Sequence, residues 1–91
     1  MKRRAIVTVL GMDRVGIVAG VSRVLAENSV NIEDISQTIM QDFFTMIMLV
    51  TLDEDITPIA GLQDKLNEVA DELGVKITVQ HEDIFRYMHR L

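Results

Sequence analysis

The chain has 91 residues, of which 48% are hydrophobic and 25% are charged, and its formal net charge is −5. This length is enough for one domain with one core, so we expect a single domain over residues 1–91. The acidic balance disfavours nucleic acid as the main partner. The absence of cysteine excludes disulfides and thiolate chemistry.

Targeting and membrane signals are also lacking. The basic residues 2–4 resemble the start of a signal peptide, but the apolar run behind them ends after six residues, at Gly11. No apolar run approaches the roughly 18–20 residues of a membrane helix. We therefore expect a cytoplasmic protein that does not associate with membranes.

The first half of the chain predicts strand, helix, strand, strand. Residues 5–10 are rich in β-branched side chains and end at Gly11, which predicts a strand. Apolar residues at helical spacing predict a helix over 16–27. Residues 32–40, introduced by Asn31, alternate apolar with polar side chains and predict a second strand. Residues 43–52 are apolar almost throughout, which is typical of a strand buried on both faces.

The second half predicts helix, strand, helix. Thr57 is expected to be the N-cap and Pro58 the first residue of a helix, whose apolar stripe extends from Ile59 to Leu73. Gly74 stands where a helix-ending glycine belongs. Residues 75–79 alternate as a last strand. The tail predicts a short helix over 82–90, with an apolar side that includes Ile84 and Phe85.

This order predicts an α+β, ferredoxin-like βαββαβ fold, with a core over residues 4–80. Right-handed crossovers place both main helices on one face of a four-stranded antiparallel sheet. The other face keeps apolar residues, and an uncovered apolar face usually marks an interface. We therefore expect a homodimer or a larger homo-oligomer.

The turn between the first strand and the first helix is the candidate binding loop. Gly11 and Gly16 bracket it, and Asp13 and Arg14 lie between them. The first backbone N–H groups of the helix, at Ile17 and its neighbours, have no partner within the helix and suit a carboxylate or phosphate. The loop matches neither the Walker pattern nor GxGxxG. A purely structural turn is the competing interpretation.

A family resemblance adds to this interpretation. The segment Val7-Thr-Val-Leu-Gly-Met-Asp-Arg-Val-Gly-Ile-Val-Ala-Gly-Val-Ser22, followed by Leu25-Ala-Glu-Asn and Val30-Asn-Ile32, resembles the opening of an ACT domain. The match extends over essentially the whole chain. It is closest to the stand-alone single-ACT family of uncharacterised bacterial and archaeal proteins. Similar N-terminal modules occur in formyltetrahydrofolate deformylases and glycine-cleavage repressors.

The resemblance implies a non-catalytic regulatory protein that binds an amino acid or a similar small metabolite. The ligand of ACT domains typically lies between the first strand–helix loop and the second strand, often across a dimer interface. Carried onto this sequence, the implied ligand-binding residues are Gly11, Asp13, Arg14, Gly16, Ile17, Val18, Asn31 and Ile32. Against this, Asp13 and Arg14 could pair with each other or with solvent, and Asn31 could satisfy turn backbone.

Two other function classes stay open. The fold could serve as a ligand-free oligomerisation or partner-docking module. An acylphosphatase-like enzyme could use Arg14 and Asn31, although the loop lacks the glycine-rich, valine–glutamine pattern of that family. The sequence has no Ser–His or Cys–His pair for covalent chemistry, and we predict that the protein is not an enzyme.

Metal and RNA binding are disfavoured. The spacing of His81, Glu82 and His89 differs from that of a helical metal site, so we predict no metal and no cofactor. The few aromatic residues, 4% of the chain, are too sparse for base-stacking platforms.

Overall fold

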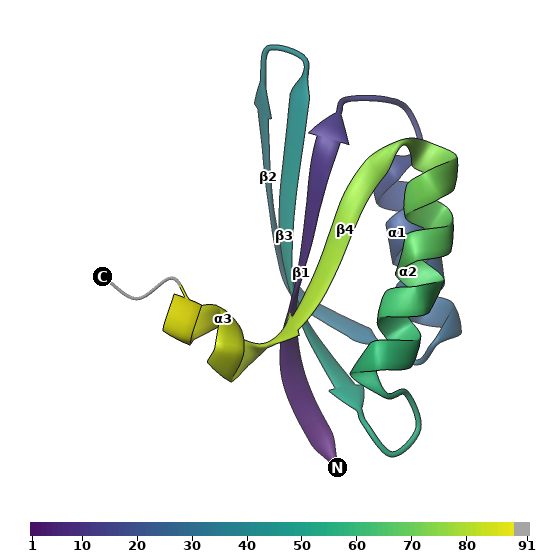
Figure 1. Ribbon diagram of the computed structural model, residues 1–91, viewed down its shortest axis with the longest axis vertical. Coiled ribbons are helices and arrows are strands. Elements are labelled where there is room, and N and C mark those ends of the chain that lie inside the picture. Colours follow the sequence, from purple (N-terminus) through teal and green to yellow (C-terminus); the bar gives the residue numbers. More distant parts are fainter. Residues whose placement is uncertain (89–91) are drawn as a thin grey trace.

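The computed structural model describes residues 1–88 and has the predicted order of elements (Figure 1). Along the chain these are β1 (Lys2–Met12), α1 (Ile17–Glu27), β2 (Asn31–Met40), β3 (Phe43–Asp53), α2 (Ile59–Leu73), β4 (Val75–His81) and α3 (Glu82–Met88). The ferredoxin-like βαββαβ prediction is therefore confirmed. Residues 89–91, which include the end of the predicted terminal helix, lie outside the described residues.

The four strands form one antiparallel sheet in the order β2-β3-β1-β4. Val7 marks its centre, since it pairs with Met48 of β3 on one side and with Val79 of β4 on the other. The β2–β3 hairpin turns at Gln41, whose φ of 56° is left-handed. The β2–β3 register shifts between Ile32 and Asp34, which is a β-bulge.

Helices α1 and α2 cover one face of the sheet (Figure 1). Alternate residues of β1 and β3 point into this layer and are fully buried, because successive side chains of a strand face opposite sides. Gly20 permits a close approach of the helices, since a Cβ there would lie 3.1 Å from Leu73 Cδ1. The buried set includes Val7, Val9, Ile17, Val21, Leu25, Met46, Met48, Val50, Leu62 and Leu66.

The other face of the sheet is not covered by α1 or α2. The prediction that β3 is buried on both faces is wrong, because Phe43 and Ile47 are exposed on this side. Two helices can cover only the face onto which their crossovers return, so the apolar run is buried at alternate residues only. The short helix α3 lies on the uncovered side and, among the described elements, packs against β1 and β4.

The entry to α2 differs from the prediction. Pro58, in extended backbone, is the N-cap, and the helix begins at Ile59. The Thr57 hydroxyl caps nothing in α2; it donates a 2.7 Å hydrogen bond to the carbonyl oxygen of Asn28, just after α1. It thereby ties the start of one helix to the end of the other. The predicted helix end at Gly74 is confirmed, with φ at 70°.

Candidate functional site

The β1–α1 loop lies at one end of the sheet, beside the β2–β3 turn. Met12 pairs with Phe43, and the Asp13 amide donates a 2.7 Å hydrogen bond to the Asp42 carbonyl oxygen. Gly16 is the N-cap of α1, with φ at 95°, and no side chain caps the helix there. The amides of the first turn, which follow Gly16, therefore remain without a side-chain acceptor. These are the amides for which the sequence predicts binding of a carboxylate or phosphate.

Two residues of the loop have evident structural roles. The Arg14 guanidinium donates a 3.1 Å hydrogen bond to the carbonyl oxygen of Leu73, the last residue of α2. A cation at a helix C-terminus is favourable because of the helix dipole. Gly11 is required for strand packing, since a Cβ there would lie 2.8 Å from Val75 Cγ1. Asp13 is exposed and extends from the loop into solvent.

The other predicted site residues lie at the opposite end of the sheet. Asn31 pairs with Thr51, and Thr51 pairs with Arg4 of β1. The eight steps along β1 from Arg4 to Met12 correspond to about 26 Å at ~3.3 Å per residue. Within one chain, the structure therefore does not bring Asn31 and its neighbour Ile32 to the β1–α1 loop.

A hollow of about 440 Å³ surrounds Asn31. It is polar on several sides, and the Oγ1 atom of Thr51 is shielded from solvent there without a hydrogen-bond partner among the described residues. Its lining residues are Lys2, Ser29, Asn31, Glu33, Thr51, Leu52, Asp53 and Ile56. Sequence analysis missed this hollow, because its walls come from the start of β1, the start of β2, the end of β3 and two loops.

The charges around this hollow are partly compensated. The amino terminus of Met1 lies 2.7 Å from Asp53 Oδ1 and 2.6 Å from Asp55 Oδ2. The hydrogen bond from this ammonium lowers the pKa of the Asp53 carboxyl below its ordinary value, and the same contact raises the pKa of the ammonium. Glu33 lies 3.5 Å from the Arg4 guanidinium. Of the lining carboxylates, Asp53 and Glu33 therefore each already have a cationic partner.

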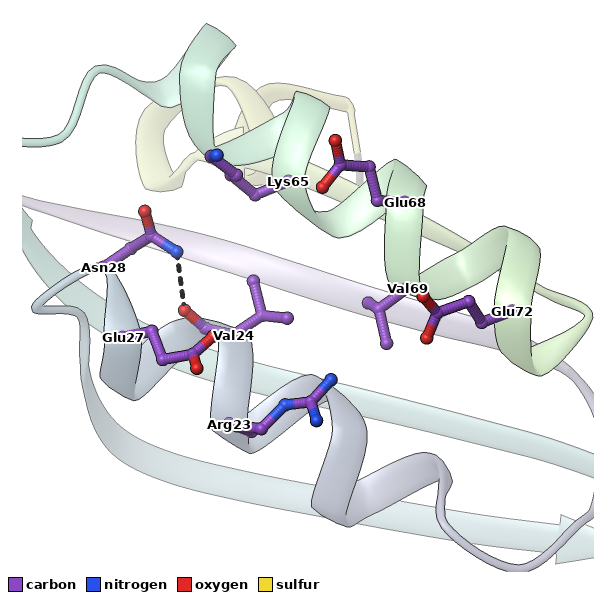
Figure 2. A pocket seen from close by; sticks show the side chains of 8 residues that line it. All are labelled: Arg23, Val24, Glu27, Asn28, Lys65, Glu68, Val69 and Glu72. Carbon is purple, nitrogen blue, oxygen red and sulfur yellow. Dashed lines mark hydrogen bonds between the residues drawn. The ribbon is translucent and has the colours of Figure 1, made fainter.

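A second hollow, of about 200 Å³, lies between α1 and α2 on the outer side of the helical layer (Figure 2). Cations and carboxylates alternate around it, and the Asn28 amide already donates to the Val24 carbonyl oxygen at 2.8 Å. The lining residues are Arg23, Val24, Glu27, Asn28, Lys65, Glu68, Val69 and Glu72. These are largely the residues that the helical pattern places toward water, and nothing in their arrangement selects a ligand.

Residues 1–88 contain neither a metal-binding cluster nor a membrane-spanning helix. Within that range no three His, Asp or Glu side chains gather in a way that could hold a metal ion. His81 Nε2 instead lies 3.1 Å from Glu54 Oε1. His89, the other histidine considered, lies outside the described residues. None of the helices over this range is long and apolar enough to cross a membrane.

The fold places the chain in the ferredoxin-like βαββαβ class, with an uncapped helix start after its first strand. Within that class, the chain belongs to the ACT domain family, because a model of the ACT domain matches residues 3–80. A UPF0237 protein of Methanopyrus kandleri is 56% identical over 88 residues, which cover 97% of this chain and 98% of that protein. The predicted family is therefore confirmed.

Solved structures agree with this assignment. An ACT domain protein from Streptococcus pneumoniae superimposes with a TM-score of 0.79 at 41% identity, covering 91% of this chain and 93% of the other. A putative glycine cleavage system transcriptional repressor gives 0.78 at 21% identity, with 89% and 46% covered. A formyltetrahydrofolate deformylase from Pseudomonas putida gives 0.76 at 19% identity, with 85% and 28% covered. The last two share the fold alone.

Proposed function

We propose that this ACT domain protein is a non-catalytic, cytoplasmic regulatory protein that binds an amino acid or a similar small metabolite. The proposed site lies between the β1–α1 loop of one copy and Asn31 of a second copy. The observation that carries the proposal is the placement of two polar binding features at opposite ends of the sheet, one after the interior strand β1 and one on the edge strand β2. Neither is complete within one chain.

A homodimer through β2 would bring the two features together. Strand β2 is an edge strand, so its outer backbone N–H and C=O groups are available to pair. Antiparallel pairing of two β2 strands about a two-fold axis places the Asn31 end of one copy beside the Met40 end of the other. The Met40 end adjoins the β1–α1 loop through the hydrogen bond from Asp13 to Asp42. Each such dimer would therefore contain two equivalent sites.

Exposed apolar side chains support this pairing. Ile35 pairs with Met48 and Ile39 pairs with Phe44, whose side chains lie on the helix-covered side of the sheet. Ile35 and Ile39 are nevertheless exposed, because the helices do not reach this far along the edge strand. Strand pairing with a second copy would shield these side chains from water.

The chemistry of the composite site suits a zwitterion. The free amides at the start of α1, from Ile17 and Val18, would accept a carboxylate at the positive end of the helix dipole. The exposed Asp13 carboxylate would accept a hydrogen bond from an α-ammonium group. The Asn31 amide of the second copy offers both donors and an acceptor. The Arg14 guanidinium donates to the Leu73 carbonyl oxygen, so we assign Arg14 a structural role in holding the conformation of the loop.

The proposal is tested by a thermal-shift screen of the purified protein against the amino acids, with phosphate and nucleotides as comparison ligands. A ligand at a hundredfold excess over its Kd stabilises the native state by ~2.7 kcal/mol, which corresponds to several degrees in Tm for a domain of this size. We expect Asn31→Ala to abolish the response. The matched control Asn67→Ala, at an exposed position on the flank of α2 toward β4, should retain it.

A flat response to all amino acids at millimolar concentration would contradict the ligand proposal. It would favour the second candidate, a ligand-free docking module, for which the uncovered sheet face is the supporting observation. The acylphosphatase-like alternative is disfavoured because Arg14 and Asn31 lie at opposite ends of the sheet. We expect no acyl-phosphate hydrolysis, and a hydrolysis rate lost in Arg14→Ala would contradict the non-catalytic assignment.

A further inference from the structure

We infer that the side chain of Gln63 closes the β4 edge of the sheet against a second copy of this chain, so that pairing through strand edges is confined to β2. The inference rests on the proposed β2 pairing only for the size of the resulting assembly. It gives a role to a side chain that the proposed ligand site does not involve.

The sheet has two edges, and each exposes unpaired backbone groups unless something covers them. The strand order β2-β3-β1-β4 leaves β2 and β4 outermost. An exposed strand edge is a template for pairing with another chain. A copy that could pair through both edges would not stop at a dimer, because each dimer would still present a free edge to the next copy. A finite assembly therefore requires that one of the two edges is closed.

The sequence of β4 favours pairing with copies of itself. Residues 75–80 read Val-Lys-Ile-Thr-Val-Gln, with four β-branched side chains, one charge and no proline. Short segments of this composition readily form intermolecular β-structure. Lys76 is exposed and, as a lysine on an edge strand, opposes pairing near the start of β4. The middle of the strand, residues 77–79, carries no charge and needs another means of protection.

The Gln63 side chain occupies this middle part of the β4 edge. Its Nε2 atom donates a 2.9 Å hydrogen bond to the Ile77 carbonyl oxygen, and its Oε1 atom accepts a 2.9 Å hydrogen bond from the Val79 amide. Backbone groups of residues two apart in a strand point to the same side, so both groups belong to the edge that faces away from β1. A neighbouring strand would use the same acceptor and the same donor. The side-chain amide thus takes the place of an added strand.

Helix α2 holds Gln63 in this position. The helix lies alongside β4 (Figure 1), and Gln63 Nε2 also donates a 2.9 Å hydrogen bond to Asn67 Oδ1, one turn further along α2. The amide therefore uses both its donor and its acceptor capacity. The helix itself does not fill the edge, because a hollow of about 360 Å³ lined by residues of both α2 and β4 remains between them. Closure of the edge thus depends on the side chain of Gln63.

The β2 edge has no such cover from α2. Among the described elements, α2 contacts β4 and not β2. Ile77 and Val79 of β4 are buried, whereas Ile35 and Ile39 of β2 are exposed. The Ile35 amide bonds at 2.8 Å to the carboxylate of the adjacent Asp34, an exposed and local contact that water or a second strand can replace. The two edges therefore differ in how readily they accept a second copy.

Amide hydrogen exchange of the full chain, measured by NMR, tests the closure directly. We expect the Val79 amide to exchange at least about 10-fold faster in Gln63→Ala than in the wild-type protein, because its acceptor is lost. The amide of Thr78, which points toward β1, is the internal control and should change little. Equal rates for Val79 in both proteins would overturn the inference, as would equal acceleration of Val79 and Thr78, which would report general destabilisation.

Sedimentation velocity tests the consequence for assembly. We expect the mass of wild-type protein to reach a limit as its concentration is raised. Gln63→Ala should exceed that limit at least about two-fold, since dimers would then join through β4. The matched variant Gln63→Glu keeps an acceptor for Val79 and places a charge on the edge, so it should behave as the wild-type protein does. Equal growth of both variants, or of neither, would overturn the inference.

Failure of this inference and failure of the proposed function are distinguishable. Asn31→Ala should abolish the ligand response and keep the slow exchange of the Val79 amide. A monomeric wild-type protein with a dimeric Gln63→Ala variant would support closure of the β4 edge and contradict pairing through β2. A wild-type protein that grows without limit would overturn the inference, because the β4 edge would be open in the presence of Gln63.

Discussion

The two faces of the sheet differ far more in their exposure to solvent than in the types of residue that form them. Along β3, Met48 is fully buried whereas its neighbour Ile47 is 39% exposed, although both are large apolar residues in an almost unbroken apolar strand. The difference arises because α1 and α2 cover only the side of the sheet on which Met48 lies. An almost unbroken apolar strand thus predicts that both of its faces are shielded from water. It does not indicate which of the two faces is covered by helices of the same chain.

The strongest test of this comparison is a matched pair of truncations in β3. Met48→Ala removes a side chain from the closed core, and we expect the free energy of unfolding to fall by about 2–5 kcal/mol. Ile47→Ala, measured at a concentration low enough for monomer, should cost less than about 1 kcal/mol because its side chain is already partly in water. Urea unfolding followed by circular dichroism gives both values.

Equal losses for Met48→Ala and Ile47→Ala in the monomer would contradict the division into a covered and an uncovered face. Repeating the Ile47→Ala measurement at high protein concentration sharpens the comparison. If the uncovered face pairs with a second copy, the cost of Ile47→Ala should rise with concentration, while that of Met48→Ala should exceed it throughout.

Two glycines extend the comparison from side chains to backbone. A Cβ at Gly11 would lie 2.8 Å from Val75 Cγ1 and 3.1 Å from the Val75 Cα, so Gly11→Ala forces β1 and β4 apart. We expect a loss of about 1–3 kcal/mol. Gly61 lies in α2 with no atom near its missing Cβ, so Gly61→Ala should stabilise the protein by about 0.5–1 kcal/mol. A lower Tm for Gly11→Ala together with a higher Tm for Gly61→Ala would confirm that only Gly11 is required by close packing.

The hydrogen bond that links the two helices is expected to have a smaller effect on the free energy of unfolding. The Thr57 hydroxyl is almost fully buried and donates to the Asn28 carbonyl oxygen, and it links the ends of α1 and α2. We expect Thr57→Val, which keeps the shape of the side chain, to cost about 1–2 kcal/mol, because a buried acceptor loses its partner. Thr57→Ser retains the donor and should lose less. A larger loss in Thr57→Ser than in Thr57→Val would show that packing dominates here.

Periodicity and turn chemistry were sufficient to predict the fold. The alternation in residues 75–79, the helical spacing in 59–73 and the glycine at 74 all reflect local preferences that the tertiary structure keeps. The start of α2 was predicted wrongly at Thr57 because its hydroxyl finds a better acceptor in a segment 29 residues away. Sequence spacing cannot reveal such a partner.

The candidate site was harder to predict for the same reason. The loop over 11–16 and Asn31 were grouped because the family resemblance groups them, and only the strand register shows that they lie at opposite ends of the sheet. The structural role of Gly11 depends on the pairing of β1 with β4, which brings Val75 against it. Both facts follow from long-range pairing and not from any local signal.

Arg14 provides the finest test, because it separates a structural from a ligand-binding role for the β1–α1 loop. Its exposed hydrogen bond to the Leu73 carbonyl oxygen ties the loop to the end of α2, so we expect Arg14→Ala to cost about 0.5–1.5 kcal/mol in urea unfolding. If this is its whole role, ligand-induced stabilisation should be the same in Arg14→Ala as in the wild-type protein. A response that falls while stability is unchanged would place Arg14 in the site, and the loop would then bind its ligand through a side chain as well as through the amides of α1.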